Sequence, residues 1–169
     1  MKEIAILPVG ADEVEAIAAL ARIIWQDCYA GIISQKQIDY MLGDRYGARR
    51  MREELQTPGI WWDQALVDGE RAGFASTLRT STPGELKLDK LYIHPAHQRQ
   101  GVGGALIAHV AARGLKDDPP ARTLILSVNK QNVRAQAAYR KHGFTVRQAI
   151  CVDIGQGFVM DDYVMAKVL

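Results

Sequence analysis

The chain has 169 residues, of which 48% are hydrophobic and 24% are charged, as is typical of a globular protein with a sizeable core. This length predicts a single domain over residues 1–169. The net charge of +2 is too small to predict binding to nucleic acid or to an anionic membrane. Cys28 and Cys151 are isolated, so neither a disulfide framework nor a metal site is expected. Because no segment reads as a signal peptide or a membrane span, we expect a cytoplasmic protein.

The first third of the chain predicts one short strand and three helices. The strand covers residues 3–9. Asp12 and Glu15 have the spacing of a capping box, and Ser34 is typical of the N-cap of a second helix. A third helix is expected over residues 48–55. The first helix carries an apolar stripe at helical spacing, formed by Ile17, Leu20, Ala21, Ile24 and Cys28.

The rest of the chain is richer in strands. Asp68-Gly69 separates two apolar segments and favours a two-residue hairpin turn. The expected strands cover residues 60–67, 71–78, 85–93, 123–128, 146–154 and 158–168, with one helix from the glycines at 101–104 to the break at 117–120 and another over 133–142. Strands and helices in this order predict a mixed α/β layer fold.

A glycine-rich turn follows the strand that ends at Ile93. Three glycines between positions 101 and 104 lie where a helix begins, and the unpaired N–H groups of a helix N-terminus bind phosphate. Arg99 adds a positive charge. A dinucleotide fingerprint would need glycine at Leu106, and the Gly-Lys-Ser/Thr of a P-loop is absent. An ordinary strand-to-helix turn remains an alternative for this pattern taken alone.

Two motifs together carry a resemblance to a known family. The pattern Gln98-x-x-Gly101-x-Gly103 resembles the coenzyme A loop of the GCN5-related N-acetyltransferase (GNAT) family. The segment 132–144, with Asn132, Ala135, Tyr139 and Gly143-Phe144, is similar to the second signature of that family. The resemblance implies a bacterial acetyl-CoA-dependent N-acetyltransferase and the possibility of a homodimer. It also implies a mixed sheet of about seven strands that splays between strands 4 and 5, with helices on both faces.

The resemblance assigns roles to individual residues. Tyr139 is expected beside the cofactor sulfur as the catalytic acid, and Asn132 against the cofactor arm. The remaining cofactor-binding residues are expected to be Leu91, Tyr92 and Ile93 for the pantetheine, and Gln98, Arg99, Gln100, Gly101, Val102, Gly103 and Gly104 for the pyrophosphate. No metal is expected.

The chemistry also requires a general base. An aliphatic amine has a pKa near ~10, so a carboxylate must accept its proton, directly or through water. Ser127 stands where N-terminal acetyltransferases of the family carry Glu. Asp89 is the leading candidate for the base, because Asp is disfavoured inside a central strand unless it works or pairs. An ion pair with Lys87 is the alternative, and Glu85 is a weaker candidate.

The acceptor is expected to be a small amine such as a polyamine. Segments 25–29 and 157–163 are similar to bacterial spermidine/spermine acetyltransferases. The acidic residues that could line a polyamine site are Asp27, Asp39, Asp44, Asp89, Asp161 and Asp162. Acetylation of protein N-termini or lysines is one alternative. A non-catalytic acyl-CoA sensor is the other, and Tyr139 argues against it because a pure binder needs no proton donor at the sulfur.

Overall fold

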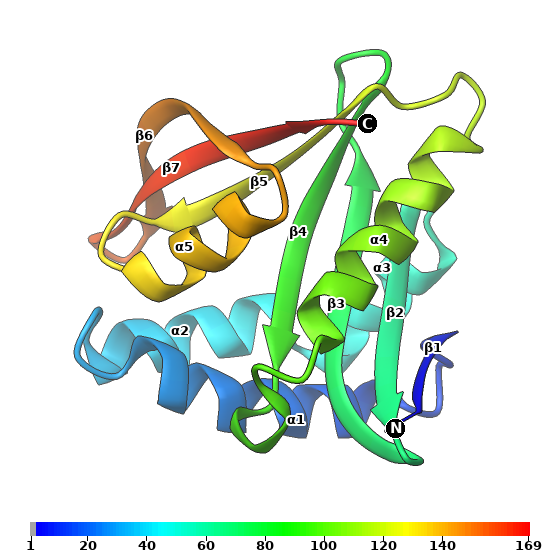
Figure 1. Cartoon of the computed structure of the whole chain (residues 1–169). Coiled ribbons are helices and arrows are strands. Elements are labelled where there is room, and N and C mark those ends of the chain that lie inside the picture. Colours follow the sequence, from blue (N-terminus) through cyan, green and yellow to red (C-terminus); the bar gives the residue numbers. More distant parts are fainter. Residues whose placement is uncertain (1–2) are drawn as a thin grey trace.

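A computed structural model of the protein describes residues 3–169, so the first two residues of the domain predicted over 1–169 lie outside it. Within this range the elements follow one another as shown in Figure 1: β1 (Ile4–Pro8), α1 (Val14–Tyr29), α2 (Gln35–Arg45), α3 (Ala48–Gln56), β2 (Ile60–Val67), β3 (Glu70–Arg79), β4 (Glu85–Ile93), a 3₁₀ turn (Pro95–His97), α4 (Val102–Leu115), β5 (Thr123–Asn129), α5 (Val133–Lys141), β6 (Thr145–Gly155) and β7 (Phe158–Val168). None of the described helices is long and apolar enough to cross a membrane.

The strands form one seven-stranded sheet in the order β1-β2-β3-β4-β5-β7-β6. Neighbouring strands are antiparallel except β4 and β5, which are parallel. These two strands pair over three residues only, from Glu85 opposite Thr123 to Lys87 opposite Ile125. Beyond this point they diverge, and Figure 1 shows the wedge that opens between them. The predicted splay between strands 4 and 5 is therefore confirmed.

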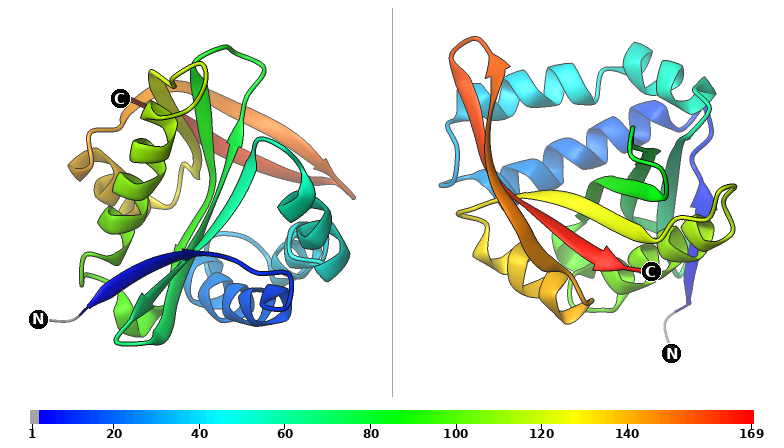
Figure 2. Two further views of the ribbon diagram at one scale, coloured as in Figure 1. Left: turned by 90° about the vertical axis from the view of Figure 1, so that its right-hand side faces the viewer. Right: turned by 90° about the horizontal axis from the view of Figure 1, so that it is seen from above.

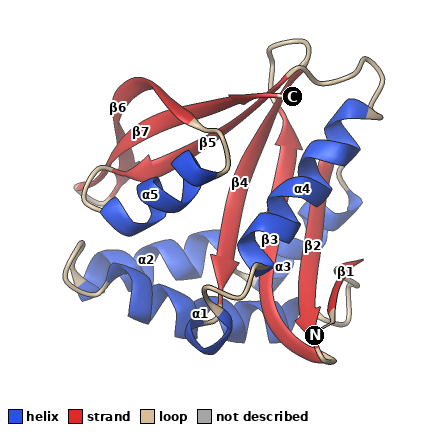
Figure 3. Cartoon of the chain, viewed as in Figure 1, coloured by secondary structure: helices blue, strands red, loops and turns tan. Residues whose placement is uncertain are grey.

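Helices cover both faces of the sheet, as predicted. Figure 2 and Figure 3 show α1, α2 and α3 on one face and α4 and α5 on the other. Each face has its own core: Trp25, Trp62 and Phe74 are among the buried side chains of the first, and Leu106 and Phe144 among those of the second. The splayed strands therefore lie between two separately packed layers.

The capping box predicted at Asp12 and Glu15 is not formed. Helix α1 begins at Val14, and its N-cap residue Glu13 makes no side-chain cap. The carboxylate of Glu13 instead accepts a hydrogen bond from the backbone N–H of Gly10 at 2.9 Å and pairs with Arg71 at 2.9 Å. Glu15 pairs with Arg52 of α3 at 2.6 Å. Long-range partners have outcompeted the local capping pattern.

The other local predictions agree with the structure. Ser34 caps α2 by accepting from the N–H of Gln37 at 3.2 Å. Asp68 and Gly69 both have positive φ, 50° and 85°, as the predicted hairpin turn requires. Gly143 follows α5 with a φ of 86°, the left-handed C-cap that glycine favours.

Candidate active site

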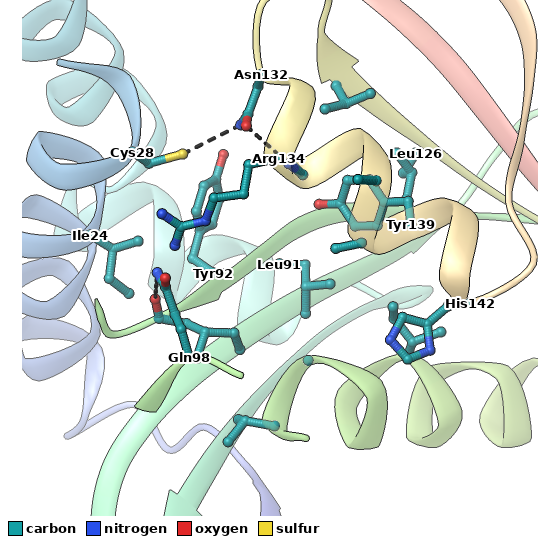
Figure 4. A pocket seen from close by; sticks show the side chains of 18 of the residues that line it. Ile24, Cys28, Leu91, Tyr92, Gln98, Leu126, Asn132, Arg134, Tyr139 and His142 are labelled. Carbon is teal, nitrogen blue, oxygen red and sulfur yellow. Dashed lines mark hydrogen bonds between the residues drawn. The ribbon is translucent and has the colours of Figure 1, made fainter. Parts of the chain in front are cut away.

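A pocket of about 1080 Å³ occupies the wedge between β4 and β5. Its walls come from β4, β5, the N-terminus of α4, the inner face of α5 and the C-terminal half of α1. Figure 4 shows Leu91 of β4 and Tyr139 of α5 approaching this space from opposite sides. The volume is at the upper end of what small-molecule and cofactor sites usually have, which suits a long ligand.

The N-terminus of α4 forms a backbone cradle at one end of the pocket. Gly101 precedes the helix with a φ of 86°, a left-handed conformation, and offers no side-chain cap. The first intrahelical hydrogen bond is donated by the N–H of Ala105, so the N–H groups of residues 102–104 are open to a ligand. A Cβ built on Gly103 would meet only Ile93 at 3.9 Å. The cradle therefore has both the donors and the space that a pyrophosphate needs.

The neighbouring loop residues divide into those that shape the cradle and those that face the ligand. Gln98 donates its amide N–H to the carbonyl of Ile93 at 3.2 Å, and Gln100 donates to the carbonyl of Ala96 at 2.8 Å. Both glutamines thus brace the loop, and of the seven residues predicted for the pyrophosphate only Gln100 does not line the pocket. Arg99 lines it with an exposed side chain.

The C-terminal half of β4 forms the floor. Opposite β3, Ser76 pairs with Lys90 and Thr77 with Leu88, so Asp89 is the extra residue of a β-bulge. Because β5 has already diverged, the backbone of residues 91–93 is unpaired on that side. All three residues line the pocket. The side chain of Tyr92 turns toward α1, where its hydroxyl lies 3.1 Å from that of Tyr29.

Helix α5 brings Asn132 and Tyr139 to the opposite wall. The side-chain oxygen of Asn132 caps the helix by accepting from the N–H of Ala135 at 3.1 Å, and its amide donates to the sulfur of Cys28 at 3.4 Å. Most of its hydrogen-bonding capacity is therefore used inside the protein. If Asn132 contacts the cofactor arm, the contact would depend on the shape of this wall as well as on the amide group.

Tyr139 points its hydroxyl into the pocket. The ring packs edge-on against Phe144 with centroids 5.9 Å apart, and no hydrogen bond reaches the hydroxyl from residues 3–169. Burial, and secondarily the neighbouring Cys28, raise the pKa of Tyr139 well above its ordinary value. The phenol therefore stays protonated near neutral pH and is free to donate its proton to a ligand atom.

Asp89 lies at the pocket wall, but its carboxylate is surrounded by cations. It pairs with Lys90 at 2.7 Å, Arg45 at 3.0 Å and Lys87 at 3.2 Å. Burial alone would raise the pKa of Asp89, but the charges of Lys90, Arg45 and Lys87 outweigh it and hold the pKa well below its usual range. The alternative ion pair with Lys87 is thus present, and these contacts make Asp89 a weak proton acceptor.

Glu85 lies away from the wedge. It belongs to the part of β4 that still pairs with β5, and its carboxylate binds Arg147 at 2.7 Å and the hydroxyl of Thr80 at 3.0 Å. It does not line the pocket. The structure therefore separates Glu85 from the other residues predicted for the site.

Arg134 and Cys28 are among the pocket-lining residues that the sequence prediction of the cofactor site did not include. Arg134 lines the pocket from the first turn of α5 and, among the described residues, forms no ion pair; Figure 4 shows its guanidinium extending across the opening toward Gln98. Cys28 closes the wall from α1, and burial raises the pKa of its thiol. The spacing of Cys28 predicted only an apolar stripe, whereas Arg134 falls inside the second signature and could have been selected by its charge.

Helix α2 and the β6–β7 hairpin are joined beside the wedge by two hydrogen bonds and a ring contact. The amide of Gln37 donates to the carbonyl of Val159 at 2.8 Å, and the hydroxyl of Tyr40 donates to the carbonyl of Ile154 at 2.6 Å. The ring of Tyr40 also packs on Phe158, with centroids 5.5 Å apart. Figure 2 shows the tip of the β6–β7 hairpin meeting α2. We call these contacts the α2–hairpin bridge.

The split sheet, the open helix N-terminus and the protonated tyrosine are features suited to an enzyme with a long, phosphorylated cosubstrate. Comparisons with known proteins identify the class further. The pattern of the acetyltransferase (GNAT) family matches residues 18–144. An uncharacterised N-acetyltransferase of Mycobacterium tuberculosis is 30% identical over 159 residues, which cover 94% of this chain and 97% of that protein. The chain therefore belongs to the GNAT family of acetyl-CoA-dependent N-acetyltransferases.

Two further matches come from Thermoplasma acidophilum. Its spermidine N(1)-acetyltransferase is 24% identical over 154 residues, which cover 89% of this chain and 91% of the relative. The crystal structure of its PaiA N-acetyltransferase in complex with coenzyme A has a TM-score of 0.82 at 23% identity and covers 99% of both chains. The second likeness confirms the fold.

Proposed function

We propose that the protein transfers the acetyl group of acetyl-CoA to a small primary amine of the polyamine kind. The observation that carries this proposal is the α2–hairpin bridge. It joins Gln37 and Tyr40 to the β6–β7 hairpin across the face of the wedge that the acceptor would use. A folded protein or a long peptide would have to break these contacts to reach the wedge, whereas a small amine would not.

The acidic side chains of this region support a cationic acceptor. Four of the six predicted for it already have partners: Asp39 accepts from Gln35, Asp44 pairs with Arg50, Asp89 with three cations and Asp161 with Lys130. In the part of the chain that the structure describes, no hydrogen bond or ion pair reaches Asp27 or Asp162. Asp27 lines the pocket with an exposed side chain, so it can attract an ammonium group there.

The residues of the cleft divide the work of the reaction. Bound acetyl-CoA supplies a thioester that an unprotonated amine can attack. The N–H groups of residues 102–104, together with Arg99, would hold the pyrophosphate, and the unpaired backbone of residues 91–93 would orient the pantetheine arm. Tyr139 holds the proton that the departing sulfur requires. The choice of acceptor is supported by a spermidine acetyltransferase that is 24% identical and aligns over 89% of this chain.

The experiment that tests this function is the release of free thiol from acetyl-CoA in the presence of single acceptors. The panel contains spermidine, putrescine, an arylalkylamine, an aminoglycoside and peptides with free N-termini or lysines. We expect turnover with the small aliphatic amines and little with the peptides. Turnover confined to peptides would favour a protein acetyltransferase, and tight binding of coenzyme A without turnover of any amine would favour a sensor. A cytoplasmic location and a homodimer stay predictions from the sequence.

A further inference from the structure

Asp162 is a buried carboxylate without a partner. It lies in β7, opposite Asn129 of β5 and Ile150 of β6, and is only 7% exposed. One of its carboxylate oxygens is fully buried with no hydrogen-bond partner, and among residues 3–169 no ion pair reaches it. Burying a charged group in this state is energetically costly, because no hydrogen bond or ion pair replaces its lost hydration. Its presence therefore calls for an explanation, such as a function.

The side chain of Asp162 belongs to the face of the sheet that looks toward α2. Side chains alternate along a strand, so Met160, Asp162 and Val164 share one face of β7. Met160 contacts the amide of Gln37 in α2 through its sulfur, at 3.6 Å. Val164 is directly opposite Ser127, and Ser127 lines the pocket. Asp162 therefore stands one residue pair beyond the pocket wall, on the acceptor side of the wedge.

The charges around Asp162 come from each element that faces it. Arg45 of α2 and Lys87 of β4 are near enough to stabilise its ionised form without forming an ion pair, and Lys130 adds to this effect. The neighbouring Asp161 acts in the opposite sense. Burial is the largest influence and raises the pKa of Asp162 above its ordinary value.

Asp162 and Asp89 therefore differ in the property that a general base requires. Asp89 already shares its oxygens with Lys90, Arg45 and Lys87, and a carboxylate so occupied gains little from a proton. Asp162 has an oxygen that binds nothing, and its raised pKa moves its proton affinity toward the operating pH. Arg45 and Lys87, which also bind Asp89, partly offset the effect of burial on the pKa of Asp162.

We propose that Asp162 is the carboxylate that accepts the proton of the acceptor amine, directly or through one water molecule. This assignment rests on the proposed function. In the step, the amine nitrogen forms a bond to the acetyl carbon and the carbon–sulfur bond breaks. The nitrogen gives its proton to Asp162, and the sulfur takes one from Tyr139. Asp162 then releases its proton to solvent, and Tyr139 regains one.

The test compares Asp162→Asn with Asp161→Asn in the full-length protein. The amide is nearly isosteric with the carboxylate but cannot accept the proton. Asp161 is the matched control, because its side chain lies on the other face of β7, away from the acceptor, and pairs with Lys130. We would measure kcat at saturating amine from pH 5 to pH 10, together with the affinity for coenzyme A by calorimetry.

We expect Asp162→Asn to lower kcat about 10²-fold or more and to abolish the acidic limb of the kcat–pH profile. Affinity for coenzyme A should stay within twofold. Asp161→Asn should keep the wild-type kcat and the acidic limb, with the limb moved to lower pH because the charge of Asp161 raises the pKa of Asp162. A raised KM with an unchanged kcat and an unchanged acidic limb would overturn the proposal, because it would make Asp162 an anchor for the ammonium group. Absence of turnover by the wild type with every amine would instead refute the proposed function, so the two failures are distinguishable.

The stability of the variant provides an independent measurement. Because the pKa of Asp162 is raised in the folded protein, the ionised carboxylate opposes folding at neutral pH, and this cost grows as the pH rises through the folded pKa. Asp162→Asn should therefore melt at the same or a higher temperature than the wild type at pH 7. Low activity in a protein that is at least as stable would support the catalytic role. Low activity accompanied by a lower melting temperature would contradict it.

Discussion

Lys87 faces Ile125 in the last parallel pair between β4 and β5, and the sheet is open from this pair onward. Two residues later, Asp89 forms the bulge at which β4 changes its pattern of alternation. The cosubstrate pocket begins at this point, with Leu88 and Asp89 as its first lining residues from β4. The end of strand pairing and the start of the candidate active site thus coincide in the fold.

Replacement of Tyr139 with Phe should slow acetyl transfer while leaving the cosubstrate site intact. The phenyl ring keeps its edge-on packing against Phe144, but the proton donor is lost. We expect kcat to fall about 10²-fold or more and the Kd of coenzyme A to change less than twofold. Steady-state kinetics and calorimetry measure the two quantities. An unchanged kcat would remove Tyr139 from the chemistry.

Replacement of Gly103 with Val should block the pyrophosphate cradle. A Cβ on residue 103 would lie in open space beside the free N–H groups, 3.9 Å from the side chain of Ile93. The valine side chain would therefore occupy the space proposed for the pyrophosphate. We expect the Kd of coenzyme A to rise about 100-fold, with no cost in helix propensity because Val is a better helix former than Gly. The control is Ala108→Val, which adds the same kind of group on the exposed face of α4. Equal affinities of the two variants would refute the cradle.

Asp89→Asn should lower stability, in contrast to Asp162→Asn. Removing the Asp89 carboxylate leaves Arg45 without its buried counter-charge and Lys90 with only the more distant Glu54, 3.9 Å away. Breaking a buried pair in this way typically costs about 3–5 kcal/mol. Because the pKa of Asp89 is lowered in the folded state, its contribution is present above the unfolded pKa and is lost as the pH falls through the folded value. Urea unfolding at pH 7 and at about pH 2.5 measures this, because the loss begins only below the ordinary Asp pKa of about 4. A variant as stable as the wild type at pH 7 would show that these ion pairs do not stabilise the fold.

Tyr40→Phe should loosen the α2–hairpin bridge. The substitution removes the 2.6 Å hydrogen bond to the carbonyl of Ile154 and keeps the ring on Phe158. One such hydrogen bond contributes about 0.5–1.5 kcal/mol, so the hairpin tip should open more often. Hydrogen exchange should be faster at residues 154–160 and unchanged in β2 and β3. If hydrogen exchange at residues 154–160 is the same in the wild type and in Tyr40→Phe, the bridge does not hold the hairpin tip in place.

Much of the cosubstrate site could be predicted from the sequence, because local signals define it. Glycines near 101–104 must lie at a helix start if a strand ends at Ile93, and the segment 132–144 must form a short helix with Tyr139 on its face. The structure brings these parts to one pocket. The glycines of the turn could be recognised because its backbone geometry allows only a few residue types.

The acceptor side could not be predicted in the same way, because its properties depend on long-range pairing. Nothing near Asp89 in the sequence indicates that Arg45 of α2 would bind it, or that a bulge would turn it toward Lys90. The special position of Asp162 depends on the register between β5 and β7, which sequence patterns leave open. The prediction of a capping box at Asp12 and Glu15 was wrong for the same reason. Arg52 binds Glu15 and Arg71 binds the N-cap residue Glu13, and both arginines come from distant elements.

The most direct test of the account measures thiol release from acetyl-CoA with spermidine as acceptor, for the wild-type protein and for Gly103→Val side by side. We predict that the wild type releases thiol in proportion to the acetylspermidine formed, and that Gly103→Val loses this activity at acetyl-CoA concentrations that saturate the wild type. Equal rates for the two proteins, or no release by the wild type with spermidine or any other small amine, would contradict the claim that the wedge between β4 and β5 is the active site of a small-amine acetyltransferase.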